Sequence, residues 1–501
     1  MNKVTKNIIA NYFGKLWGFV SIFLFVRLYI DILGIESYAI INFYTVILGL
    51  LAFADAGLTA TLTRELARNN NIETKSNLVF TFERIYLCIC LILIMVIALS
   101  SNIMSQNFLA SKTYPPETVA HYLRLIGIGV ALQLFSTLYE GGLNGLQYQV
   151  LTNKVRITWG VFRTGIVLIP LYFFPKLDIY FWWQILCNLV LLFVFRYLLY
   201  SLLPNAKPIF SKKLLKSTSK YALGMMGIAF ISAINIQIDK LVTSKYLSME
   251  EFGFYSIAST LAQLPTLVVI PIVVAVFPLL SMLISEQDIK STEKIFHKYS
   301  FLIACITTPI VICIGLYATQ LITLWTGREE IALSIDSIVR FLLVGGLFLC
   351  LQLTPFYLAL ANGFTKINLY SGIIGLIIIV PMMIYAIKNY GMIGVTFPWI
   401  FINLMTFFIM GIYVVRRFLN NQVFIWLFWD IFIPILVTIV VVIIVEFILK
   451  TYTGNYIFII KSIIIGLCSL FLNLYINSKK FPDNVLVNFG SILNKVQGKL
   501  K

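Results

Sequence analysis

The sequence predicts an all-α, polytopic membrane protein with about 14 transmembrane helices. Roughly 14 apolar stretches fill the chain, each near the ~20 residues with which a helix crosses the ~30 Å hydrocarbon core. Of the 501 residues, 60% are hydrophobic and 12% are charged, and the mean hydropathy is +0.92. The stretches are continuously apolar, whereas the strands of a membrane barrel alternate in polarity over about ten residues. Helices are therefore favoured.

The expected spans follow one another with short polar connections. The first is too long for the apolar part of a cleavable signal peptide and is expected to stay as a helix. The eighth contains Pro265, Pro271 and Pro278, each of which removes a helix hydrogen bond. Both a hinge and a static bend fit these prolines. In order, the predicted spans are residues 8–33, 37–60, 78–101, 118–140, 157–174, 178–200, 221–243, 252–284, 299–322, 336–360, 368–388, 392–415, 425–449 and 455–477.

The formal net charge of +17 fits the topology of a membrane protein. With a cytoplasmic N-terminus and one crossing per stretch, most lysines and arginines fall on the cytoplasmic side, as the positive-inside rule requires. Both termini are therefore expected in the cytoplasm. The basic residues follow no pattern typical of nucleic-acid binding, so no nucleic-acid partner is expected.

Two short echoes predict an internal duplication. Residues 33–41 (LGIESYAII) resemble residues 247–255 (LSMEEFGFY), and Asn-Gly pairs occur at 144–145 and 362–363. The number of residues between the two similar segments is nearly the same as that between the two Asn-Gly pairs. Such repeats favour a transporter built of two helical bundles. We expect an N-terminal six-helix bundle (1–202), a basic cytoplasmic linker (203–220), a C-terminal six-helix bundle (221–417), two additional helices (418–477) and a basic cytoplasmic tail (478–501).

A polar stripe on the first span points to a hydrated interior. Asn7, Asn11 and Lys15 are four residues apart and so share one helix face. A charge near the centre of a span costs about 2.5–3.5 kcal/mol on insertion scales, which disfavours a lipid-facing position. Lys15 would attract an anionic substrate there. The alternative is that it snorkels to the surface or pairs with a nearby acid.

Further cations in the spans suggest a phosphate-binding interior. Arg163 lies seven residues after Arg156, on the same helix face, and an arginine fork there would bind a phosphate. Interfacial anchoring is the alternative. Arg124 and Arg340 are the other candidate cations for substrate binding, from the fourth and tenth spans.

The remaining polar candidates are ion-coupling groups or structural ion pairs. Asn235 and Asp239 lie on one face of the seventh span. Because Lys240 directly follows Asp239, an ion pair between these two residues is favoured, and ion coupling through Asp239 is the alternative. Asp55, Glu83, Arg84 and Glu140 complete this set. Because more of the charged residues within the spans are basic than acidic, an anionic cargo fits better than a cationic drug.

No motif predicts catalysis, a cofactor or a metal. The seven cysteines lie within apolar runs without metal or redox spacing, and the two histidines lie far apart. A P-loop, GxSxG and HExxH are all missing from the sequence. We therefore expect a protein that is not an enzyme and that is driven by an ion gradient or by the substrate gradient.

Several motifs resemble one known family. Residues 33–66 contain LGIESYA, FADAG and TREL, and match the "LG…YG…D.G…R" pattern of polysaccharide-unit flippases in the multidrug/oligosaccharidyl-lipid/polysaccharide exporter superfamily. Residues 238–265, 276–282, 321–327, 358–368 and 391–400 extend the likeness, which spans about residues 5–415. Gly34, Tyr38, Asp55, Gly57 and Arg64 match the pattern and are expected to be structural. Ala39 departs from the usual glycine, which Gly253 keeps in the second half.

The resemblance implies a MATE-like fold and a transport function. It implies two six-helix bundles with two extra helices, and alternating access around a central cavity. Its cargo would be an undecaprenyl-pyrophosphate-linked oligosaccharide, such as an O-antigen unit for lipopolysaccharide, flipped across the bacterial cytoplasmic membrane. Membrane lipids are the expected surroundings, and a polysaccharide polymerase and a chain-length regulator are candidate partners.

Three other functions compete with this one. A peptidoglycan lipid-precursor flippase and a multidrug antiporter belong to the same superfamily, although the antiporter would need an acid-lined cavity. An integral-membrane polysaccharide polymerase or ligase is the alternative from another class. Such enzymes would be expected to have a large outward loop, and every predicted outward loop here is short.

Overall fold

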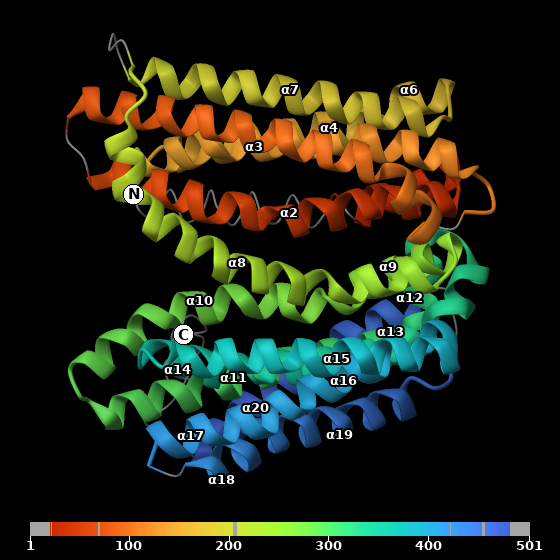
Figure 1. The fold of residues 1–501 in the computed structure, drawn as a ribbon. Coiled ribbons are helices and arrows are strands. Elements are labelled where there is room, and N and C mark those ends of the chain that lie inside the picture. Colours follow the sequence, from red (N-terminus) through yellow and green to blue (C-terminus); the bar gives the residue numbers. More distant parts are fainter. Residues whose placement is uncertain are drawn as a thin grey trace, which may run out of the picture. The chain divides into compact units, whose positions relative to one another are not determined.

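A computed structural model describes residues 21, 23–68, 71–109, 111–203, 208–420, 422–452 and 456–480. Within these ranges the protein is helical and has no strand (Figure 1). Among the described residues, ten helical segments are long and apolar enough to cross a membrane, so the chain is a multi-pass membrane protein. The described chain separates into two compact units, one ending at Ser256 and including Trp325–Gly327, and the other comprising the remainder.

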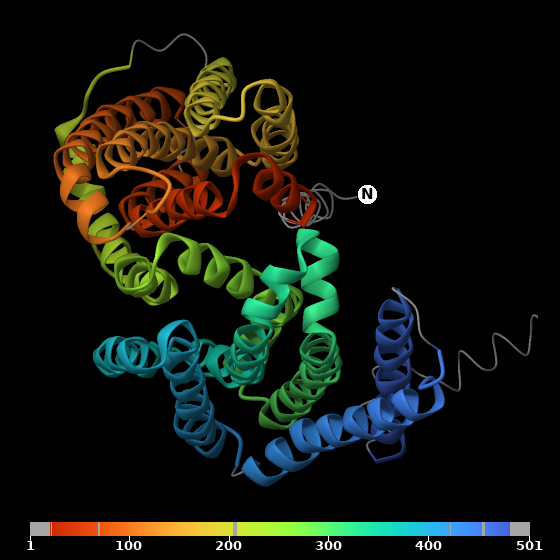
Figure 2. The same ribbon diagram turned by 90° about the vertical axis from the view of Figure 1, so that its right-hand side faces the viewer.

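The first unit is a helical bundle centred on α4. After the helical residues 23–33, Gly34 takes a left-handed conformation (φ +83°), which only glycine adopts readily, and the chain turns into α2. α4 packs against α2, α3 and α7, and α8 packs along α2 (Figure 1, Figure 2). The elements are α2 (Ile35–Arg68), α3 (Ile72–Asn107), α4 (Pro116–Gly145), α5 (Gln149–Gly160), η1 (Val161–Ile166), α6 (Leu168–Phe173), α7 (Leu177–Ser201), α8 (Lys212–Tyr246) and the start of α9 (Met249–Ala262).

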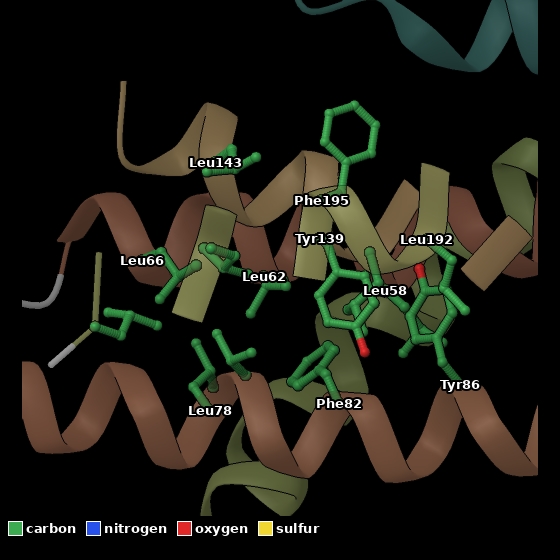
Figure 3. Packing of buried hydrophobic residues seen from close by; sticks show 14 of the residues in the cluster. Leu58, Leu62, Leu66, Leu78, Phe82, Tyr86, Tyr139, Leu143, Leu192 and Phe195 are labelled. Atoms are coloured by element: carbon green, nitrogen blue, oxygen red, sulfur yellow. The ribbon is translucent and has the colours of Figure 1, made fainter. Parts of the chain in front are cut away.

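The core of this unit follows from four-residue spacing. Leu58, Leu62 and Leu66 share one face of α2, and Leu78, Phe82 and Tyr86 share one face of α3. These faces meet residues of α4 and α7, and Figure 3 shows the side chains of Leu62, Phe82 and Tyr139 pointing toward one another. In a bilayer such contacts stabilise the bundle through packing, because the lipid is as apolar as the leucines.

Two glycines bring α4 close to α2. A Cβ added to Gly141 would lie 2.3 Å from Cγ2 of Thr59, and one added to Gly145 would lie 2.7 Å from the backbone oxygen of Thr63. In addition, the Thr63 hydroxyl donates to the Gly141 carbonyl oxygen (2.9 Å). This small-xxx-small spacing is typical of close helix pairs in membranes.

The second unit is organised around α11, which packs against α10, α13, α19, α20 and η3. Asp288 caps the start of α11, and its hydrogen bonds from Ser291 hold the pKa of its carboxyl below the ordinary value. The elements are α10 (Leu264–Ser285), α11 (Ile289–Leu316), α12 (Ala318–Thr326), α13 (Glu329–Leu351), α14 (Leu353–Ala361), α15 (Thr365–Gly394), α16 (Thr396–Met405), η2 (Thr406–Gly411), α17 (Ile412–Phe418), α18 (Val423–Ile425), η3 (Trp426–Phe432), α19 (Ile433–Ile448) and α20 (Ile457–Lys480).

The ten spans correspond to ten of the expected 14. The other four expected spans are 8–33, which lies largely outside the described residues, 37–60, 157–174 and 221–243. The apolar part of α2 is Ile35–Leu51, and 157–174 is divided among α5, η1 and α6. The total of 14 therefore stays a prediction. Of the three prolines, Pro265 follows a break between α9 and α10, whereas Pro271 and Pro278 lie inside α10.

Candidate functional site

The candidate site in the first unit is built around Arg163, in the π-helical segment η1. At about 1.5 Å per residue, Arg163 lies ~21 Å from the start of α5 and ~15 Å from the end of α6. Its side chain is half-buried, and its guanidinium carbon lies 4.8 Å from the ring centroid of Trp159 and 5.3 Å from that of Tyr44. Such ring faces attract a cation without neutralising its charge.

A glutamine fixes the direction of the guanidinium. Nε of Arg163 donates to Oε1 of the buried Gln184 on α7. Among the described residues the two Nη groups have no hydrogen-bond partner, and no carboxylate lies within ion-pair distance. Arg163 therefore keeps a full positive charge and free donors that could bind an oxyanion.

Three side chains from two helices hold the π-helical backbone of η1. Trp183 Nε1 donates to the carbonyl oxygen of Phe162 (2.9 Å), Gln184 Nε2 to that of Arg163 (3.2 Å), and Tyr29 Oη to that of Thr164 (2.5 Å). Three successive carbonyls thus accept side-chain hydrogen bonds. π-Helical turns are rare and often occur at functional sites.

A second layer fixes the ring of Tyr44. The Tyr44 hydroxyl donates to Gln133 Oε1 (2.9 Å), and Asn188 Nδ2 donates to that hydroxyl (3.1 Å) and to the Gly129 carbonyl oxygen (2.8 Å). A Cβ on Gly129 would lie 3.2 Å from the Tyr44 ring. The aromatic face beside Arg163 is therefore held by α2, α4 and α7 together.

The acidic candidates of this unit have hydrogen-bonding or ionic partners. Asp55 accepts hydrogen bonds from the hydroxyls of Thr59 and Tyr86. Glu140 pairs with Arg156, with 2.7 Å between Oε2 and Nη2. Arg156 is therefore half of an ion pair, and the two arginines of the predicted fork differ in their surroundings.

Glu83 and Arg84 do not pair with each other in the structure. Glu83 pairs with Arg196 on α7 (3.0 Å) and accepts a hydrogen bond from Tyr200. Arg84 is exposed, and its guanidinium lies 4.7 Å from the ring centroid of Phe80.

Arg124 and Arg340 each have hydrogen-bonding partners of their own. Arg124 is exposed and donates to Ser101 Oγ and Asn102 Oδ1 of α3, both at 3.1 Å. Arg340 belongs to the second unit, where it pairs with Asp336 (3.1 Å) and donates to the carbonyl oxygen of Gly315.

On α8, Asn235 donates to its own helix, at the carbonyl oxygen of Ile231. Asp239 lies 3.7 Å from Lys240 Nζ, the favoured ion pair, and accepts a hydrogen bond from Tyr255 (2.8 Å). Asn7, Asn11 and Lys15 lie outside the described residues, so their roles stay predictions.

With this geometry in view, comparison with known proteins identifies the family. The family model of the polysaccharide biosynthesis proteins matches residues 1–284, more than half of the chain. The chain belongs to the polysaccharide biosynthesis protein family. This confirms the family resemblance that the sequence motifs indicated, and the matched region includes Arg163 and all the residues that hold it.

Two relatives of the chain have names that concern surface or secreted polysaccharides. It is 23% identical to the "Putative O-antigen transporter" of Shigella flexneri over 372 residues, which cover 73% of this chain and 87% of the relative. It is 31% identical over 84 residues to the "Succinoglycan biosynthesis transport protein ExoT" of Rhizobium meliloti, 17% of each chain.

Solved structures show that this family member has a MATE-like fold. The lipid II flippase MurJ, in an inward closed conformation, superposes with a TM-score of 0.74 at 16% identity, covering 95% of this chain and 99% of MurJ. An inward-facing MATE family multidrug transporter gives a TM-score of 0.66 at 15% identity, covering 84% and 99%. The MATE-like part of the predicted fold is thereby confirmed.

Sequence reasoning missed most partners of Arg163. Gln184 and Asn188 are neutral residues inside an expected span, and their four-residue spacing on α7 was the signal that could have found them. It also missed two pairs of the second unit whose charges lie within or next to apolar runs, the buried His297–Asp430 and the half-buried Lys461–Glu446. In the part of the chain that the structure describes, no group of three or more His, Cys, Asp or Glu residues could hold a metal ion.

Proposed function

We propose that the chain is a flippase for oligosaccharide repeat units of a surface polysaccharide, such as O-antigen. The repeat unit would cross the bacterial cytoplasmic membrane linked through a diphosphate to a polyprenyl lipid. Family membership, the polysaccharide-related names of the relatives and ten candidate membrane spans support this proposal. They favour transport over the polymerase or ligase reaction.

The single observation that carries the choice of cargo is the unpaired charge of Arg163. The diphosphate of the cargo bears about two negative charges, and its desolvation in a membrane is prohibitive without compensating donors. Arg163 offers a cation with free Nη donors, oriented by Gln184 and the rings of Trp159 and Tyr44. We propose that it binds a phosphate of the cargo during transport.

In this proposal the other predicted cations contribute less to phosphate binding than Arg163. Lys15 would be a second phosphate contact, with Asn7 and Asn11 on the same face. Arg124 and Arg340 already bond with neighbouring helices or with Asp336, and so have less capacity for a substrate. Asp55, Glu83 and Glu140 act structurally, because their oxygens have partners within the bundle.

The transport cycle we propose is alternating access between two six-helix bundles, with the boundaries 1–202 and 221–417, joined by the linker 203–220. Residues 418–477 would add two helices and residues 478–501 a cytoplasmic tail. Both termini would be cytoplasmic, and an ion gradient would drive the cycle. A polymerase and a chain-length regulator are the proposed partners.

The test is complementation of a bacterial strain that lacks its own repeat-unit flippase. Arg163→Ala should reduce surface polysaccharide about tenfold or more, since a charged hydrogen bond contributes about 1.5–3 kcal/mol. Arg163→Lys should restore only part of the transport, because it keeps the charge but not the planar fork. The readout is the amount of surface polysaccharide at equal protein abundance in the membrane.

Arg417→Ala is the matched control. This arginine also lies over aromatic rings, with 4.6 Å to the centroid of Phe364, but it lies in the other unit. Polysaccharide at the level of the unmodified protein in Arg163→Ala would contradict the phosphate-binding role. Rescue instead of a strain that lacks its peptidoglycan-precursor flippase would replace the cargo with that precursor, which carries the same diphosphate.

A further inference from the structure

A buried histidine–aspartate pair lies in the second unit, far along the chain from Arg163. Nδ1 of His297, on α11, is 2.6 Å from Oδ2 of Asp430, on the π-helical segment η3. The side chains are only 13% and 4% exposed. Both helices are candidate membrane spans, and ionisable residues inside a membrane are most often functional.

The surroundings of the pair are apolar. Phe296 directly precedes His297, and Trp426 lies four residues before Asp430. Their ring centroids are 6.3 Å apart, and both residues belong to a buried cluster that includes Phe407 and Ile431. Water is therefore largely excluded from the pair. A net charge on the pair would be costly there.

No second described charge neutralises the pair. α10 has no charged or titratable side chain, and Asp336 and Arg340 of α13 pair with each other. The remaining groups on the packed elements include Glu293, Lys298 and Cys305 on α11, Tyr357 on α14, Glu446 on α19 and Lys461 on α20. Glu446 pairs with Lys461 (2.8 Å), and of this set the Cys305 thiol is within electrostatic reach of Asp430.

The free ring nitrogen identifies where a proton would bind. We assign Nδ1–H as the donor to Asp430, so Nε2 is the atom that gains or loses a proton. Nε2 is buried and has no hydrogen-bond partner among the described residues. Without a proton on Nε2 the pair has a net charge of −1, and with it the pair is a neutral imidazolium–carboxylate couple.

The same unit contains other unpaired polar atoms. α20 packs against α11 and α19, and its Ser469 and Asn473 are fully buried, one helical turn apart. Neither the Ser469 hydroxyl nor either polar atom of the Asn473 amide has a described partner. Buried polar groups without protein partners are ordinary sites for water, which can carry protons.

We propose that His297 and Asp430 form the proton-binding site that couples this transporter to the proton gradient, an inference that rests on the proposed transport function. Histidine is the side chain that changes charge near neutral pH. The buried pair holds the proton on Nε2, because loss of the proton leaves an uncompensated carboxylate. A conformation that hydrates the pair stabilises that carboxylate and releases the proton. Such a difference in proton affinity is what coupling requires.

The first test is a titration of the ring in the purified full-length chain. The chain has two histidines, so His121→Asn leaves His297 as the only one. With ¹⁵N-labelled histidine in nanodiscs, the ring of His297 should change between its neutral and protonated forms as the pH is varied across the range in which the protein stays folded. Asp430→Asn should lower its proton affinity about tenfold or more, because the imidazolium loses its counter-charge.

His121 of the unmodified chain is a matched control for this titration. Its Nε2 lies 3.0 Å from Asp178, but the two side chains are 48% and 42% exposed. Asp178→Asn should therefore change the titration of His121 far less than Asp430→Asn changes that of His297. A His297 ring that stays in one protonation state over this range, or that titrates equally with and without Asp430, overturns the proposal.

The second test is transport under a varied proton gradient. Surface polysaccharide in the complementation strain should fall when the external pH is raised from 6 to 8. This pH dependence should disappear in His297→Asn and Asp430→Asn and persist in His121→Asn. Unchanged pH dependence in either buried variant overturns the proposal.

The two tests separate this proposal from the proposed function. A chain that restores no polysaccharide in the complementation strain contradicts the proposed function, and the ring titration then decides whether the proton site exists. If His297→Asn or Asp430→Asn fails to accumulate in the membrane, the titration of His297 in the His121→Asn chain alone decides whether the proton site exists.

Discussion

Single residues differ chiefly in whether their charge has a partner. Glu83, Glu140 and Glu446 each pair with a lysine or arginine, whereas Arg163 lies between aromatic rings. Removing one partner of a buried pair leaves the other uncompensated. We therefore expect structural effects from the paired acids and functional effects from Arg163.

At Asp55 the structure favours a structural role over ion coupling, and Tyr86→Phe tests this. The substitution removes one of the two hydroxyls that donate to Asp55, so the protein should unfold more easily, by about 1–3 kcal/mol. The measurement is the thermal unfolding midpoint in detergent, with Tyr370→Phe as control because that ring is 58% exposed. An altered pH dependence of transport with an unchanged midpoint would favour ion coupling instead.

At the scale of elements, hydropathy predicted where the helices lie but not the π-helical segments within them. The apolar runs predicted α7 and α11 because apolar length is the main requirement for crossing a bilayer. They could not predict the π-helical segments η1 and η3. The backbone carbonyls of η1, for example, accept hydrogen bonds from side chains of other helices, such as Trp183 and Tyr29. For the same reason Arg163 was found as a cation, but Gln184 was not found as its partner.

Helix contacts in the first unit depend on Gly145, which gives a prediction at the scale of elements. Gly145→Ala would place a methyl group 2.7 Å from the Thr63 backbone oxygen, so α2 and α4 must separate. We expect a destabilisation of about 1–3 kcal/mol, measured as a lower thermal unfolding midpoint. Gly466→Ala is the control, because its Cβ would meet nothing within 4 Å. Equal midpoints for the two variants would contradict close packing at Gly145.

At the scale of the whole molecule, the distribution of charge predicts the orientation in the membrane. The positive-inside rule acts through basic residues near the ends of the spans, and the first turns of α8 and the tail after α20 both contain several lysines. Phosphatase and fluorescent-protein reporters fused after residues 211 and 480 should therefore both report the cytoplasm. A fusion after residue 176, between α6 and α7, should report the opposite side, because one passage through α7 separates it from residue 211. A periplasmic signal at 211 or 480 would reverse the orientation, and with it the direction in which Arg163 would receive its cargo.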